Sequence, residues 1–243
     1  MLPVPGRFKL VILLAGLSLL TCPGWGQEVP SREGFRAAAG KKYNEALVYL
    51  WSNPWISDTL QAAGVDPQFA AAIVFPEVVR YSLLRDRMEV MGLLSLYVKY
   101  GRAYADFSVG RFQMKPSFLE QVEADAVENR IPAKVAEETP QTRLERVKRL
   151  GSPEWQVKYL AAFINILDAR FKHKNWSSTE EKLKFYATAY NAGYTNSEAC
   201  IRELIPAKTF YTTLLPGEPR YAYAEIACEY FSLFGKNEKP ITL

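Results

Sequence analysis

The sequence has few of the residues on which many enzyme mechanisms depend. It contains a single histidine, His173, and three cysteines. A metal site built from several histidines is therefore excluded, and a Ser-His-Asp or Cys-His mechanism would have to use His173. Because lysines flank this histidine on both sides, we expect it to be a solvated residue at a helix end. A phosphate-binding glycine loop and a CxxC pair are also missing, so carboxylates are the natural catalytic candidates.

Long alternating runs of apolar and polar residues are absent too, and so are repeats of solenoid length. Helical spacing of apolar residues dominates instead, and the 49% hydrophobic and 23% charged composition is that of a globular protein. These features predict a single all-α domain with its core between about residues 40 and 235. The formal net charge of +4 falls to +2 if the N-terminal segment with Arg7 and Lys9 is removed, which is too weak to indicate nucleic-acid binding but is compatible with an anionic cell-wall polymer.

The N-terminus has the order of a secretory signal peptide. Arg7 and Lys9 precede an apolar run from Leu10 to Leu20, and small and turn-forming residues follow up to Gly26. This predicts a signal peptide over residues 1–26, a mature domain over residues 27–243, and export to the periplasm or cell envelope. Two alternatives are an uncleaved anchor and a lipid-carrying Cys22, although Leu19-Leu20-Thr21 is a poor match to a lipobox.

Two cysteines remain if Cys22 leaves with the signal peptide. In an exported protein, Cys200 and Cys228 would form one disulfide between two C-terminal helical segments. The alternative is a pair of buried thiols.

Helix start and stop signals divide the rest of the chain. Residues 31–42 are polar and poorly patterned, so we expect a flexible entry there. Helices are expected over the following segments: 44–63 with a break at Pro54 and a stop at Gly64, from the cap Asp66-Pro67 to a break at Pro76, 117–129 from a capping box of Ser117 and Glu120, from Thr139-Pro140 to Gly151, from Ser152-Pro153 to about Phe171, from Ser178 to Gly193, 197–204 and 221–234.

Glu77 is the carboxylate with the least polar surroundings, in Phe75-Pro76-Glu77-Val78-Val79. If this stretch is buried, the loss of hydration raises the pKa of Glu77, as a proton donor at neutral pH requires. The alternative is that Glu77 turns outward beyond Pro76.

Two further segments stand out, Ser108–Pro116 and Ala189-Tyr190-Asn191-Ala192-Gly193. With Glu77 they resemble the lytic transglycosylase family, which has a Glu after an apolar helix, then Gly-x-x-Gln-x-x-Pro, then Ala-Tyr-Asn-Ala-Gly. The resemblance covers about residues 65–195. The sequence departs from the family pattern in having Pro76 before the Glu, Val78 where the family usually has Ser, Arg111-Phe112 in place of a Leu-Met pair, and an expected insertion around Met88 to Tyr100.

The resemblance implies a lysozyme-like helical fold with a glycan-binding cleft. Glu77 would protonate the bond between N-acetylmuramic acid and N-acetylglucosamine in peptidoglycan, then act as the base that closes a 1,6-anhydro ring, without metal or cofactor. Gln113 would bind the neighbouring sugar, and the Tyr190 hydroxyl would orient Glu77. The remaining substrate-binding positions implied are Asn191 with the Gly193 turn, Ser108, Phe112 and Met114.

Other functions stay open at this point. A hydrolytic lysozyme would usually need a second carboxylate, for which Asp106 is the best candidate, with Asp86 and Glu89 behind it. A non-enzymatic protein of the same fold could bind glycan strands or brace an envelope-spanning machine. A Glu77 side chain that points into a cleft would favour the enzyme, whereas one that points into solvent or a salt bridge would favour the scaffold.

Overall fold

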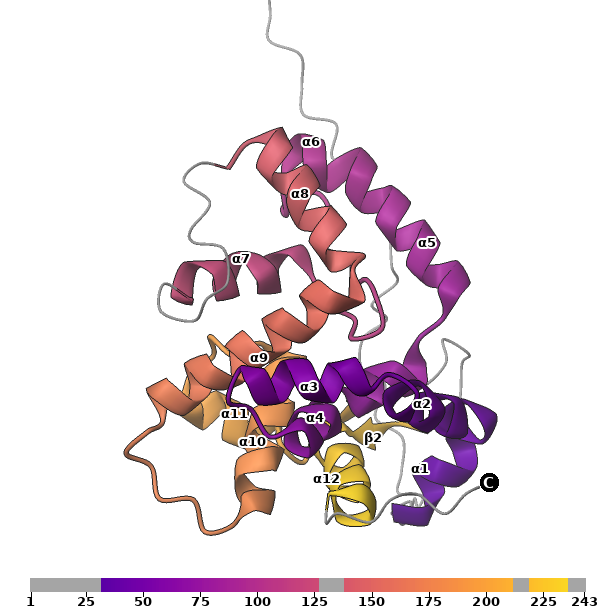
Figure 1. Cartoon of the computed structure of the whole chain (residues 1–243), viewed down its shortest axis with the longest axis vertical. Coiled ribbons are helices and arrows are strands. Elements are labelled where there is room, and N and C mark those ends of the chain that lie inside the picture. The colour runs from indigo at the N-terminus through magenta and orange to yellow at the C-terminus, as the bar shows by residue number, and fades with distance from the viewer. Residues whose placement is uncertain (1–31, 127–137, 212–218, 236–243) are drawn as a thin grey trace, which may run out of the picture.

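The computed structural model describes residues 32–126, 138–211 and 219–235, and most of these are helical (Figure 1). The all-α class predicted from the sequence is confirmed. Within the described ranges the sheet is a single antiparallel pair in which Lys208 faces Ala222 and Phe210 faces Tyr221. The elements are α1 (Arg32–Ala39), α2 (Lys41–Trp51), α3 (Pro54–Ala62), α4 (Pro67–Arg80), α5 (Leu83–Gly92), the π-helix η1 (Leu93–Tyr97), α6 (Val98–Tyr100), α7 (Pro116–Asp125), α8 (Pro140–Leu150), α9 (Pro153–Arg170), α10 (Thr179–Ala192), α11 (Glu198–Leu204), β1 (Lys208–Phe210), β2 (Tyr221–Ala222) and α12 (Tyr223–Phe234).

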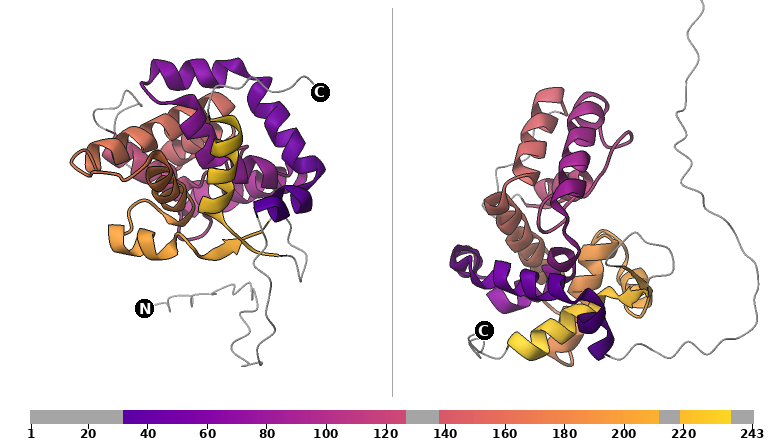
Figure 2. Two further views of the ribbon diagram at one scale, coloured as in Figure 1. Left: turned by 90° about the horizontal axis from the view of Figure 1, so that it is seen from below. Right: turned by 90° about the vertical axis from the view of Figure 1, so that its right-hand side faces the viewer.

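Helix α4 lies at the centre of the larger part of the molecule. Helices α2, α3, α10 and α12 pack around it, and its residues Ile73, Val74 and Phe75 have no exposed surface. Helices α5 to α8 form a second, smaller part, and α9 contacts both α3 and α4 of the first part and α7 and α8 of the second (Figures 1 and 2). The long helix α9 therefore connects the two halves of the fold.

The helix starts follow from local sequence signals. Proline occupies the first turn of α3, α4, α7, α8 and α9, where the missing N–H costs nothing. The side chains of Asp66, Thr139, Ser152 and Ser178 accept hydrogen bonds from backbone N–H groups of the helices that they begin. These four predicted caps are confirmed, as are the break before Pro54 and the end of α8 before Gly151.

Three local predictions were wrong. Helix α4 continues through Pro76 to Arg80, because burial of nearly all of its residues from Phe69 to Val79 outweighs one lost hydrogen bond. Helix α7 begins at Pro116 rather than at a Ser117 capping box. The expected flexible entry contains α1, which buries Phe35 with its ring centroid 5.0 Å from that of Tyr221.

The predicted Cys200–Cys228 disulfide is not present, since both residues are thiols, one half-buried and one buried. Helix α11 packs against α10, whereas α12 packs against both α4 and α10. The predicted signal peptide, its cleavage site and Cys22 lie outside the described residues. In the described ranges, no helix has the length and apolar character needed to cross a membrane.

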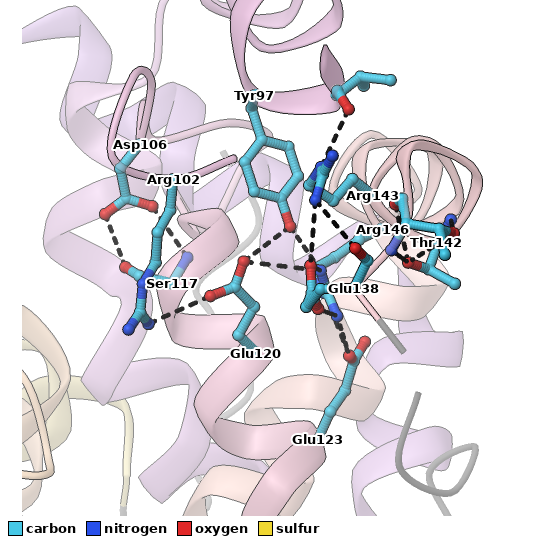
Figure 3. Close-up of polar contacts among 12 residues, drawn as sticks. Tyr97, Arg102, Asp106, Ser117, Glu120, Glu123, Glu138, Thr142, Arg143 and Arg146 are labelled. Atoms are coloured by element: carbon cyan, nitrogen blue, oxygen red, sulfur yellow. Dashed lines mark hydrogen bonds and ion pairs between the residues drawn. The ribbon is translucent and has the colours of Figure 1, made fainter. Parts of the chain in front are cut away.

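A buried ion-pair network joins α7 and α8 (Figure 3). The Arg146 guanidinium, 2% exposed, donates to Glu123 at 2.8 Å and to Glu138 at 2.8 Å, and contacts the Tyr97 hydroxyl. The other Glu123 oxygen accepts from the Tyr159 hydroxyl at 2.6 Å, which brings α9 into the network. This network fixes the smaller part of the molecule from its interior.

Candidate functional site

Glu77 is buried on α4, with 4% of its surface exposed. One carboxylate oxygen accepts a hydrogen bond from Arg80 Nη2 at 2.6 Å, one helical turn further on. Burial raises the pKa of Glu77 above its ordinary value, while the positive charges of Arg80, Arg85 and Lys115 partly oppose this rise. The predicted burial and the direction of the pKa shift therefore both hold, and the ion pair with Arg80 is an additional feature.

The segment from Val109 to Met114 forms a tight turn beside Glu77. The backbone N–H of each of these two residues donates to the other's carbonyl, at 2.8 and 3.0 Å. Gly110 has a φ of +77°, and Gln113, with a φ of +51°, is the one non-glycine residue with positive φ in the described ranges. Such strain is held only where surrounding contacts over-determine the backbone.

Three side chains from distant segments provide those contacts. The buried Gln156 amide accepts from the Phe112 N–H at 3.0 Å and donates to the Val109 carbonyl at 2.7 Å. The Tyr190 hydroxyl donates to the Phe112 carbonyl at 2.7 Å, and Asp86 accepts from the Gly110 N–H at 2.6 Å. The turn that carries Gln113 is thus clamped from α9, α10 and α5.

Replacing Gly110 with Ala tests this clamp. At φ +77° the added Cβ would lie 1.8 Å from Gln156 Nε2, so the Gln156 side chain would have to leave its hydrogen bonds. We expect a loss of about 3 kcal/mol or more in the free energy of unfolding, measured by urea denaturation.

Gly64→Ala is the matched control for Gly110→Ala. Gly64 has nearly the same φ, +75°, but open space around its Cβ position, so only the backbone strain of about 1 to 2 kcal/mol applies. Equal losses for the two variants would contradict the clamp.

The end of α10 contributes the third segment. The half-buried Tyr190 ring packs edge-on against Phe118 and Phe163, with centroid distances of 5.4 and 5.5 Å. Burial and the negative charge of Glu77 raise the pKa of Tyr190 well above its ordinary value, so its hydroxyl stays a donor. The prediction that this hydroxyl orients Glu77 was wrong in detail, because it bonds to the Phe112 carbonyl instead.

These three segments border one pocket of about 510 Å³, which lies between the α4–α10 layer and the α7 segment. Six of the residues predicted from the sequence line it: Glu77, Ser108, Gln113, Met114, Tyr190 and Asn191. Asn191 is exposed and accessible to a ligand, whereas Met114 is 2% exposed and forms part of the wall. Gln113 is half-buried, and its Nε2 donates to the Gly110 carbonyl at 2.9 Å.

Two predicted site residues do not line this pocket. Phe112 is 1% exposed and belongs to the hydrophobic core, so it takes part through its backbone only. Asp106 caps α7, since its two oxygens accept from the Ser117 N–H at 2.8 Å and from the Ser117 hydroxyl at 2.6 Å (Figure 3). Asp86 and Glu89 were the other candidates for a second catalytic carboxylate. Asp86 accepts a hydrogen bond from the Gly110 N–H, and Glu89 accepts one from Arg85 Nε. Glu77 is the one carboxylate among the residues that line the pocket.

Sequence reasoning missed the cations of the pocket, which are Arg80, Arg85, Arg102 and Lys115. Arg85 bonds to Glu89, and Arg102 pairs with Glu120 at 3.1 Å. Only Arg80 had a local signal, because its position three residues after Glu77 places both on one helix face. Since Arg80, Arg85 and Arg102 are each paired with a carboxylate, Lys115 adds the excess positive charge of the lining, which favours an anionic ligand.

The described ranges contain no group of three or more His, Cys, Asp or Glu residues placed to hold a metal ion. His173 is exposed in the turn after α9, as predicted. Comparisons with protein-family models, with curated proteins and with solved structures find no match to this chain.

Proposed function

We propose that this protein is an exported lytic transglycosylase with a lysozyme-like fold, acting on peptidoglycan in the periplasm or cell envelope. One observation carries the proposal: Glu77, the Gln113 turn and the Tyr190-Asn191 pair come from three segments far apart in the chain and line the same pocket. A chance occurrence of three motifs would not require them to meet. The pocket is then the part of a longer glycan cleft where the bond is cut.

In this mechanism the protonated Glu77 donates its proton to the glycosidic oxygen, and the bond from muramic C1 to that oxygen breaks. The transition state is oxocarbenium-like. The Glu77 carboxylate then removes a proton from the muramic 6-hydroxyl. The oxygen of this hydroxyl bonds to C1 and closes the anhydro ring. No water is consumed and Glu77 regains its proton, so one carboxylate is sufficient.

The pocket chemistry agrees with these steps. Burial keeps the proton on Glu77 to a higher pH than in water, as a general acid requires. A retaining or inverting hydrolase usually needs a second carboxylate, and Asp106 is engaged as a helix cap. The four lining cations suit a glycan that carries carboxylates on its lactyl groups or peptides.

The direct test is solubilisation of insoluble peptidoglycan, with chitin as the comparison. Chitin has the same acetylated sugar backbone but no lactyl carboxylate. We expect soluble fragments from peptidoglycan and none from chitin. Release from both would contradict the role given to the cations, and release from neither would favour the second candidate.

The second candidate is a glycan-binding scaffold without activity. The ion pair between Glu77 and Arg80 favours it, since a proton donor is best left unpaired. The two candidates differ in what Arg80 does: in the enzyme, the incoming sugar displaces it from Glu77, whereas in the scaffold the pair persists.

The pH dependence of cleavage tests the role of Arg80. Its charge lowers the pKa of Glu77, so Arg80→Met raises this pKa and Glu77 keeps its proton to higher pH. We expect the alkaline limb of the pH profile of kcat/KM to shift to higher pH. Arg102→Met, which removes a pocket cation bound to Glu120, should move it less. An unchanged alkaline limb in Arg80→Met would show that Glu77 is not the titrating acid.

A further inference from the structure

A ridge of apolar side chains projects from α5, η1 and α6, which follow one another without a break from Leu83 to Tyr100. These helices lie along the outer edge of the smaller part of the molecule (Figures 1 and 2). None of the α5 residues is buried, and Leu93 and Tyr97 of η1 anchor the stretch from its inner side. We call the ridge the α5–α6 ridge and define it by the exposed side chains of Leu84, Met88, Met91, Leu96 and Tyr100.

The ridge residues recur at intervals of four, three, five and four residues, which places them on one side of the helical stretch. The interval of five spans the π-helix η1, where Leu94 and Leu96 are both exposed. Exposure is high along the ridge, reaching 73% for Leu84 and 68% for Met91. Exposed apolar side chains grouped in this way are typical of a surface that binds another protein or a membrane.

The exposed charges within the helical stretch of the ridge itself have one sign. From Leu83 to Tyr104 the exposed charged residues are Arg87, Lys99 and Arg102, all of them cations. The two acidic residues of this stretch turn inward, where Asp86 accepts from the Gly110 N–H and Glu89 from Arg85 Nε. The partner of the ridge is therefore apolar and also anionic at its surface.

Two tyrosines at one end of the ridge add an amphipathic element. Tyr100 and Tyr104 are 49% and 66% exposed, and their ring centroids lie 5.1 Å apart. Lys99 Nζ lies 5.1 Å from the Tyr100 centroid. Exposed tyrosines beside a cation are typical of the boundary between lipid tails and head groups.

We propose that the α5–α6 ridge binds the surface of a membrane containing anionic phospholipid. The ridge can press Leu and Met side chains into the acyl boundary of the membrane while Arg87 and Lys99 contact phosphates. This binding is independent of the proposed catalysis. It would hold the pocket at a fixed distance from the membrane.

Vesicle sedimentation of the full chain tests the proposal. Vesicles of phosphatidylcholine mixed with phosphatidylglycerol are compared with pure phosphatidylcholine. The double variant Met88→Ser/Met91→Ser should lose at least about tenfold in affinity for the anionic vesicles, because its apolar contact is removed. Arg87→Glu/Lys99→Glu should lose the preference for anionic over neutral vesicles.

The matched control is Val48→Ser/Leu233→Ser, which removes exposed apolar side chains from α2 and α12 and should bind as the unchanged chain does. All variants share the same N-terminal residues, so differences between them report on the ridge. Equal binding by the Met88/Met91 variant and the unchanged chain would overturn the proposal. A dimer seen by analytical ultracentrifugation and lost in that variant, with vesicle binding unaltered, would overturn it in favour of a second copy as the partner.

Discussion

Replacing Glu77 with Gln is expected to lower the rate of peptidoglycan cleavage by about a thousandfold or more. The amide has the size of the carboxylic acid, but its N–H groups are not acidic enough to protonate the glycosidic oxygen and it is too weak a base to deprotonate the muramic 6-hydroxyl. Initial rates of fragment release from labelled peptidoglycan measure the loss.

The Glu77→Gln variant should stay folded and still bind its substrate. Arg80, which loses its ionic partner, lines the pocket and is 17% exposed in its side chain, so its charge is not left in the core. Thermal unfolding and co-sedimentation with insoluble peptidoglycan check both points. Glu145→Gln on the exposed face of α8 is the control and should keep full activity. If Glu77→Gln cleaves peptidoglycan at a rate within tenfold of that of the unchanged chain, Glu77 is not the catalytic acid.

Replacing Arg146 with Met is expected to cause the largest loss of stability, about 3 to 5 kcal/mol in the free energy of unfolding. The Glu123 carboxylate, 3% exposed, would then keep its charge in the interior with only Arg149 at 3.2 Å and the Tyr159 hydroxyl as partners. The neighbouring Tyr97 hydroxyl and Glu138 would also lose a donor. Urea denaturation monitored by circular dichroism measures the loss.

Lys148→Met is the matched control on the same helix. Lys148 forms an ion pair with Glu145 at 2.8 Å, but both side chains are well exposed, so we expect a change within about 0.5 kcal/mol. In the double variant Arg146→Met/Glu123→Gln, the neutral amide removes the stranded charge, and the total loss should be smaller than the sum of the two single losses. A small loss for Arg146→Met alone would show that the network contributes little.

Local signals along the chain were sufficient for most helix starts. Asp66-Pro67 and Thr139-Pro140 each combine a side-chain acceptor with a residue that needs no N–H partner, so the neighbouring residues alone determine where the helix begins. The burial of Glu77 was also predictable, because every residue next to it is apolar. The predicted helix break at Pro76 was wrong because the packing of a largely buried helix outweighs one missing hydrogen bond.

The long-range contacts of the site had no signal in the sequence. Gln156 clamps a turn more than forty residues away, and nothing in its own helix distinguishes it from a surface glutamine. Phe112 was expected in the pocket, but its side chain is buried in the hydrophobic core. Asp106 caps a helix because the backbone N–H of Ser117, eleven residues later, donates a hydrogen bond to its carboxylate.

The exposure of the α5–α6 ridge was not predictable from the sequence. Leucine and methionine at helical spacing are read as core residues by default, and the pattern of Leu84, Met88 and Met91 is the same whether the helix faces a core or a membrane. Only the exposure of α5 in the folded structure distinguishes these cases, since none of its residues is buried.

The mass of the reaction products tests most directly whether a single carboxylate forms the anhydro ring. Purified peptidoglycan is digested with the full chain, and the released fragments are weighed by mass spectrometry. We predict fragments lighter by one water than those released by a hydrolytic muramidase, and their absence with Glu77→Gln. Fragments of full hydrolytic mass would contradict the account and require a second catalytic group in the pocket.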